Sequence, residues 1–162
     1  MEEKLRFLAD RMLGRLGRWL RLMGLDCESV AVGEDAAEKA LEEGRILLTR
    51  NRALMRRRRL GPHLLVGSDH LPQQLEQVIA HFGIDPLAQA LSRCTRCNRL
   101  LEKVGPAPSQ TAVPWQVRQL NLPLSRCPQC GRFYWPASHS RRIRDRLERL
   151  QLYISPRLSE RR

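Results

Sequence analysis

The chain has 162 residues, of which 42% are hydrophobic and 28% charged, and its formal net charge is +12. Interspersed apolar runs exclude a disordered chain, and no run approaches the roughly 18 apolar residues of a transmembrane helix. The N-terminus, MEEKLRFLAD, lacks the basic-then-apolar order of a signal peptide. We therefore expect a protein of the reducing cytoplasm that does not associate with membranes.

The positive charge is concentrated in the second half of the chain. Residues 1–91 carry 14 Lys and Arg against 13 Asp and Glu, a net of +1, whereas residues 92–162 carry 15 against 4, a net of +11. Clustered Lys and Arg release condensed counterions when they meet phosphates, so this half favours a nucleic acid as partner. A basic surface that only keeps the protein soluble is the alternative.

Strand-like and helix-like segments alternate through the first half. Such alternation predicts an α/β fold, with a parallel sheet covered by helices on both faces. On a helical wheel of the first helix, Met12 falls with the apolar side chains and Arg21 with the polar ones. The pattern predicts strands over residues 5–10, 27–32, 45–49 and 63–67, and helices over residues 11–24, 35–43 and 72–82.

Polar residues follow several of the predicted strands. Asp10 ends the first strand, Asn51 follows the third and Asp69 follows the fourth. Because the carboxyl ends of parallel strands meet at one edge of a sheet, these side chains can face one crevice. Asp35 and Glu38, at the start of the second helix, can join them. Asp10 and Asp35 have a second interpretation, since an acid at each position can cap the helix that follows.

Two CxxC motifs, CTRC and CPQC, are the strongest signal in the second half. Two residues between thiolates let one tight turn present both sulfurs to a tetrahedral ion, and two such turns complete a closed shell. A pair of disulfides is the competing interpretation, but a cytosolic protein would not keep it. We expect a structural zinc ion with no catalytic role. Its ligands would be Cys94, Cys97, Cys127 and Cys130.

A basic segment follows the second CxxC motif and is predicted to be helical over residues 140–152. Leu147, Leu150 and Ile154 recur at helical spacing and can dock this helix on the rest of the protein. The change in charge and composition near residue 91 predicts two units. They are residues 1–91 and residues 92–162.

Four blocks of the chain read, in order, FLADRMLGRLGRWLRLMGLD, EEGRILLTRNRAL, RCTRCNRLL and RCPQCGRFYWPASH. Up to about residue 143 they resemble the Mut-seven C-terminal (Mut7-C) ribonuclease family, a branch of the PIN-like nucleases with an appended zinc ribbon. The resemblance implies a PIN-like nuclease domain followed by a zinc ribbon. It also implies RNA cleavage by Mg²⁺ or Mn²⁺ ions that carboxylates hold at the sheet edge.

The resemblance assigns catalytic roles to the acids at that edge. Asp10 matches the family's first acid, and Asp35 matches an acid at the start of a helix, with Glu38 close enough to share its task. The family usually reads TRD where this chain reads TRN, so Asn51 replaces an expected carboxylate. An amide oxygen still ligates Mg²⁺, but it adds no charge and no general base. Either Asp69, Glu42 or Glu43 compensates, or the protein is a non-catalytic binder of RNA or of the ribosome.

Several arginines are candidates for RNA contact. Four successive arginines after Asn51 suit an RNA backbone beside an acidic crevice, although a solvated loop is the alternative. The partner would be a structured RNA, such as transfer RNA or a ribosomal surface. A toxin of a toxin–antitoxin pair fits less well, because the zinc ribbon is foreign to that layout. The predicted RNA-contacting residues are Arg15, Arg56, Arg57, Arg58, Arg59, Arg141, Arg142 and Arg144.

Overall fold

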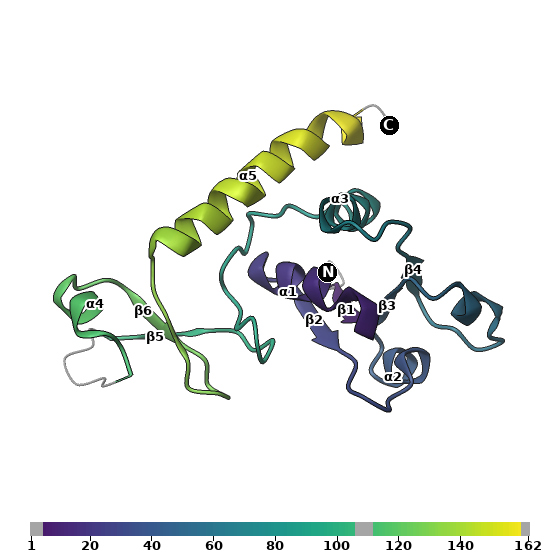
Figure 1. The fold of residues 1–162 in the computed structure, drawn as a ribbon, viewed down its shortest axis with the longest axis horizontal. Coiled ribbons are helices and arrows are strands. Elements are labelled where there is room, and N and C mark those ends of the chain that lie inside the picture. The colour runs from purple at the N-terminus through teal and green to yellow at the C-terminus, as the bar shows by residue number, and fades with distance from the viewer. Residues whose placement is uncertain (1–4, 106–111, 160–162) are drawn as a thin grey trace.

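The computed structural model describes residues 5–105 and 112–159, with side chains up to residue 154. Its first part is a four-stranded parallel sheet in the order β2-β1-β3-β4, flanked by helices (Figure 1). The predicted α/β class and the parallel sheet are therefore confirmed. The strands are β1 (Arg6–Ala9), β2 (Asp26–Ser29), β3 (Ile46–Thr49) and β4 (His63–Leu65).

Helical elements lie between the strands of this sheet and after its last strand, and residues at the ends of α2 and α3 explain where these two helices begin or end. The side chain of Asp35 accepts hydrogen bonds from the first free backbone N–H groups of α2. Pro72 stands in the first turn of α3, and Gly83 ends that helix with a φ of 63°. The helical elements are η1 (Arg11–Leu13), α1 (Gly14–Leu22), α2 (Ala36–Glu42), η2 (Arg52–Arg56) and α3 (Leu71–Phe82), where η marks a 3₁₀ helix.

The sheet is buried on both faces. Successive residues of a strand point to opposite faces, so Phe7 and Leu8 enter different apolar layers. Phe7 belongs to the larger cluster with residues of α1 and α3, whereas Leu8 packs with Ala37 and Ala40 of α2. Both Phe7 and Leu8 have no exposed surface. Two covered faces explain why the central strands β1 and β3 are mainly continuous apolar runs instead of alternating ones.

The second part contains a small antiparallel sheet and a long helix. The sheet consists of β5 (Glu102–Val104), β6 (Leu124–Arg126) and β7 (Phe133–Tyr134), with α4 (Trp115–Gln119) between β5 and β6. Helix α5 (Ser138–Ser159) leaves β7 and runs diagonally back across the molecule to α3 (Figure 1). No described helix is long and apolar enough to cross a membrane.

Helix α5 shares the core of the first part. Leu147 and Ile154 are buried in the same apolar cluster as Phe7, and Leu150 packs against it. The predicted docking of the basic helix is therefore confirmed, although the helix is longer than residues 140–152. The division into units 1–91 and 92–162 stays a prediction.

Two side chains of the first helical segment lie where the wheel did not predict them. Met12 is 64% exposed, because residues 11–13 form a 3₁₀ turn and not the first turn of an α-helix. Arg21 is only 9% exposed. Helix α1 packs closely against the sheet at Gly17, because a Cβ at that position would lie 3.2 Å from the Cβ of Ala9. Arg21 lies four residues after Gly17, on the same face of the helix, and is therefore covered by the sheet side of the molecule. Both wheel predictions are wrong.

Candidate active site and candidate metal centre

Asp10 lies at the carboxyl edge of the parallel sheet and is almost buried. One carboxylate oxygen accepts a hydrogen bond from the backbone N–H of Met12 at 2.8 Å. The other accepts from the hydroxyl of Thr49 and, at 3.3 Å, from the backbone N–H of Arg50. Asp10 therefore caps the turn after β1 and also ties the end of β1 to the end of β3.

Asn51 also acts as a cap. Its side-chain oxygen accepts a hydrogen bond from the backbone N–H of Ala53 at 3.0 Å. The backbone N–H of Asn51 donates to the hydroxyl of Thr49, also at 3.0 Å. This caps η2. An aspartate would accept the same hydrogen bond, so the local fold does not require an amide or a carboxylate at this position.

Asp35 is held by two kinds of donor. It caps α2, and Arg57 bridges both carboxylate oxygens, with N–O distances of 2.8 and 2.6 Å. The hydrogen bonds from Arg57 and from the backbone N–H of Glu38 hold the pKa of Asp35 below its usual 3.8. The same pairing raises the pKa of Arg57. Asp35 is therefore ionised, but both of its oxygens already have partners.

The remaining predicted acids, Glu38 and Asp69, are exposed to solvent. Glu38 is exposed on α2. The side chain of Asp69 is 67% exposed, with one oxygen 3.5 Å from His70 Nε2. Across the described ranges, three or more potential metal-ligating side chains converge only at the CxxC motifs. The carboxylates of Asp10, Asp35, Glu38 and Asp69 do not form such a group.

A catalytic divalent ion does not fit the carboxylates in this arrangement. Mg²⁺ and Mn²⁺ need several oxygen ligands around one position. The oxygens of Asp10 and Asp35 instead accept hydrogen bonds from N–H and O–H donors, and Asn51 is neutral. The catalytic assignments of these residues stay predictions.

The predicted RNA-contacting arginines are all exposed. They lie on separate elements: Arg15 on α1, residues 56–59 at the end of η2 and beyond it, and residues 141–144 in the first turns of α5. Arg57 differs from its neighbours because its guanidinium is engaged with Asp35. A phosphate would have to compete with that carboxylate for Arg57.

The cysteines of the two CxxC motifs converge at the small antiparallel sheet. Their sulfur atoms all lie within 4.8 Å of one another. The sulfurs of Cys94 and Cys130 are 3.8 Å apart, much longer than a disulfide bond, and all five cysteines of the chain are free. Four thiol ligands around one point fit a structural metal such as zinc. The fifth cysteine, Cys27, is fully buried in β2.

The two CxxC motifs form matching turns, which we call knuckles: residues 94–98 and residues 127–131. In the first, the backbone N–H of Asn98 donates to the carbonyl of Cys94, and in the second Gly131 donates to Cys127, each at 2.9 Å. Asn98 has a φ of 60° and Gly131 a φ of 71°. Glycine adopts this left-handed conformation freely, and asparagine tolerates it better than most residues.

Asn98 also joins the first knuckle to the parallel sheet. It is 3% exposed. Its side-chain oxygen accepts from the backbone N–H of Cys27 in β2 at 3.0 Å. Its amide nitrogen donates to Asp26 at 2.8 Å and to Glu28 at 3.1 Å. Strand β2 is at the edge of its sheet, so the knuckle protects an edge that would otherwise be open to pairing with another chain.

Charged side chains strengthen this junction. Burial alone would raise the pKa of Asp26, but hydrogen bonds from Arg45 and Asn98 outweigh it and hold the pKa below 3.8. The Arg45–Asp26 distance is 2.6 Å, and the Arg45 side chain is only 8% exposed. Arg93 adds hydrogen bonds to the carbonyls of Gly24 at 2.9 Å and Asn98 at 2.6 Å.

Tyr134 contributes to the metal centre from β7. Its hydroxyl donates to the sulfur of Cys94 at 3.1 Å. Burial alone would raise the pKa of Cys94, but hydrogen bonds, that of Tyr134 foremost, lower it to about 6. A thiol with a lowered pKa is ready to bind metal as the thiolate.

Sequence reasoning missed Tyr134, Asn98 and Arg45. For Asn98, one signal was available: it follows its knuckle's second cysteine, at the position where Gly131 stands in the other knuckle. A non-glycine residue at a position that favours glycine indicates a side chain with a task of its own.

Comparisons with known proteins agree with this organisation. A family model described as the Mut7-C RNAse domain matches residues 5–147. The human protein named exonuclease mut-7 homolog is 37% identical over 101 residues, which cover 57% of this chain and 12% of that protein. No solved structure matches the chain significantly. The family match spans the parallel sheet, both knuckles and the first part of α5.

Proposed function

The chain belongs to the Mut7-C RNAse domain family, and on this premise we propose that it binds RNA through the arginines of α5. The observation that carries the proposal is that Arg141, Arg142 and Arg144 are exposed together on a helix that docks on the core of the family domain. Residues 92–162 carry a net charge of +11. Such a concentration of guanidinium groups supports binding to a phosphate backbone.

Affinity for a labelled transfer RNA, measured over a range of salt concentrations, tests this proposal. Each phosphate contact contributes about 0.9 to the slope of log affinity against log salt. Replacing Arg141, Arg142 and Arg144 by alanine should therefore reduce that slope by up to about 2.7, or three contacts. A flat salt response of the parent protein would contradict phosphate-driven binding.

A charge-matched control separates local contacts from net charge. Arg142→Ala and Lys39→Ala each remove one positive charge, but Lys39 lies on α2 and pairs with Glu34 at 2.8 Å. We expect Arg142→Ala to weaken RNA binding and Lys39→Ala to leave it unchanged. Equal losses in the two variants would mean that only the overall charge matters.

Hydrolysis of RNA phosphodiester bonds with Mg²⁺ or Mn²⁺ is the finer proposal, and family membership supports it. The position of Asp10 at the carboxyl end of β1 also supports it, because functional groups of parallel sheets gather there. In the arrangement described, Arg57 occupies the carboxylate of Asp35. An RNA phosphate competes for the same guanidinium, so RNA binding would favour the release of Asp35.

The second candidate function is RNA binding without catalysis, with transfer RNA or a ribosomal surface as the partner. Two observations favour it: Asn51 is neutral at a position where the resemblance implies an acid, and the predicted carboxylates do not converge among the described residues. Incubation of a panel of RNAs with Mn²⁺ separates the two functions. A nuclease cleaves RNA, and Asp10→Asn abolishes the cleavage. A non-catalytic binder leaves RNA intact, and Asn51→Asp gains activity.

We also propose that zinc is the ion of the knuckles, that it is structural, and that the protein works in the reducing cytoplasm. Four thiolates form a closed tetrahedral shell with no position for a reactive water. Free thiols in this number persist in a reducing compartment. Elemental analysis of the purified protein should find one zinc ion per chain, and Cys127→Ser should lose it.

A further inference from the structure

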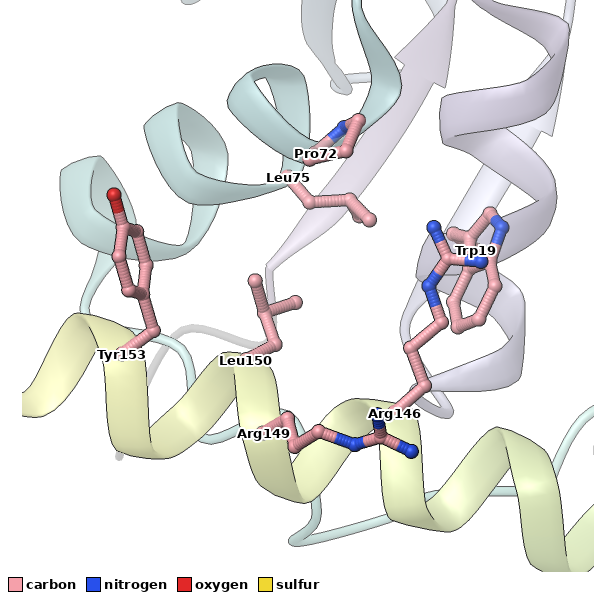
Figure 2. Close-up of a pocket in the computed structure, with 7 residues that line it drawn as sticks. All are labelled: Trp19, Pro72, Leu75, Arg146, Arg149, Leu150 and Tyr153. Carbon is pink, nitrogen blue, oxygen red and sulfur yellow. The ribbon is translucent and has the colours of Figure 1, made fainter.

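A groove between α1, α3 and α5 has the chemistry of a site for a nucleobase. Its volume is about 250 Å³. Pockets for drug-sized ligands have volumes of roughly 300–1,000 Å³, so this groove suits one ring system and not an extended ligand. The side chains that give it its character are Trp19, Leu75, Arg146, Arg149, Leu150 and Tyr153 (Figure 2).

Aromatic rings stand at the two ends of the groove. Figure 2 shows Trp19 at one end and Tyr153 at the other, with Leu75 and Leu150 between them. The guanidinium of Arg146 lies over the Trp19 ring, 4.8 Å from its centroid. Tyr153 is 53% exposed, so its ring is accessible from solvent. A flat ring that enters this groove meets an apolar floor, aromatic rings and a guanidinium plane.

The arginines of the groove belong to a stripe along α5. Arg142, Arg146, Arg149 and Tyr153 follow one another at intervals of four, three and four residues, so they share one face of the helix. The buried stripe that begins with Leu147 lies beside them on the core side. Asp145 lies on the side of the stripe away from the core, and its backbone carbonyl accepts a hydrogen bond from the side chain of Arg149 at 3.3 Å. The groove is therefore bordered by roughly one cation per helical turn.

We infer that this groove binds one unpaired base of an RNA strand and that the stripe of α5 binds the adjoining phosphates. The inference rests on the proposed RNA binding and names the place where a base is held. Aromatic rings and guanidinium planes stack on any base, whereas the arginine stripe selects a strand that carries phosphates. A purely apolar peptide segment would gain nothing from that stripe.

Tryptophan fluorescence tests the inference directly. A short oligoadenylate should quench the emission of the parent protein, and the Trp19→Phe variant should lose that part of the quenching while still binding the strand. Inorganic polyphosphate, which has phosphates but no bases, should displace the oligoadenylate without quenching Trp19. Anisotropy of labelled oligoadenylate, measured in parallel, reports binding independently of the groove.

Two matched pairs of variants locate the contact. Tyr153→Ala removes a ring of the groove, and Leu152→Ala removes a neighbouring side chain that is 74% exposed. Arg146→Ala removes the positive charge that lies over Trp19, and Lys39→Ala removes the same charge from α2, which covers the opposite face of the parallel sheet. We expect Tyr153→Ala and Arg146→Ala to weaken oligoadenylate binding about tenfold and the two controls about twofold or less.

The outcomes separate this inference from the proposed function. If anisotropy shows no binding of any RNA, RNA binding itself fails. If RNA binds but Trp19 is not quenched and the paired variants behave alike, only the groove assignment fails. A change in Trp19 emission with protein concentration in the absence of RNA would mean that a second copy of the chain fills the groove, which also overturns the assignment.

Discussion

Replacing Asn98 by glycine tests whether the metal centre stabilises the parallel sheet. Glycine adopts the left-handed φ of 60° at this position, so the knuckle keeps its turn. Only the side chain that joins the knuckle to β2 is removed. The first knuckle then has the same residue as the second, where Gly131 stands.

The expected loss can be worked out from the hydrogen bonds of Asn98. The buried N–H of Cys27 loses its partner, at a cost of about 1–3 kcal/mol. The hydrogen bond to the carboxylate of Asp26 contributes about 1–2 kcal/mol more, because it is partly buried and charged. We therefore expect the free energy of unfolding to fall by about 3 kcal/mol, which lowers the melting temperature by about 6–12 °C in a chain of this size.

Urea unfolding and zinc content, measured together, provide the assay. Asn98→Gly should lose stability and keep its metal. Asn98→Asp keeps the shape of the side chain but places a carboxylate against those of Asp26 and Glu28. It should therefore lose at least as much stability as Asn98→Gly. The control is Gly131→Asn, because a Cβ there would meet only the side chain of Arg126, at 3.4 Å. That variant should stay within about 1 kcal/mol of the parent. Unchanged stability of Asn98→Gly would refute the reasoning.

Three further predictions concern the metal, the half-buried Asp26 and the ion pair between Asp35 and Arg57. Removal of the metal with a chelator should open the small sheet, so that the amide of Val104 exchanges rapidly while that of Leu8 stays protected; equal protection before and after chelation would argue against a structural metal. Because the folded pKa of Asp26 is below 3.8, its ionised form contributes stability that is complete above about pH 4 and is lost as the pH falls through the folded pKa. Asp26→Asn should lack this part of the acid dependence in urea titrations between about pH 2 and pH 6, and an unchanged dependence would contradict the assignment. Arg57→Ala should raise the pKa of Asp35 in an NMR titration, whereas Arg58→Ala should not, and both should change stability little because these side chains are exposed.

The elements and the metal ligands could be predicted because their signals are local. Short apolar runs between helical segments predicted the strands, and the spacing within each CxxC motif predicted that Cys94 and Cys97 would share one turn. The wheel failed for Met12 and Arg21, because it assumes a regular helix from the first residue and ignores which face of the helix approaches the sheet.

The acids at the sheet edge show where local patterns stop being informative. An acid that follows a strand and precedes a helix has the same sequence signature whether it caps the helix or binds a metal. Asp10 and Asp35 are both caps in the structure. Their other partners, Thr49 and Arg57, are 39 and 22 residues away in sequence, so no local pattern reveals them. The same is true of Asn98, whose partner Cys27 is 71 residues away.

Ultraviolet crosslinking of the protein to a bound RNA, followed by mass spectrometry of the peptides, tests the central claim most directly. The account predicts crosslinks on the exposed face of α5, between residues 141 and 153, and at Trp19. Crosslinks confined to other elements, with α5 unmodified, would contradict it.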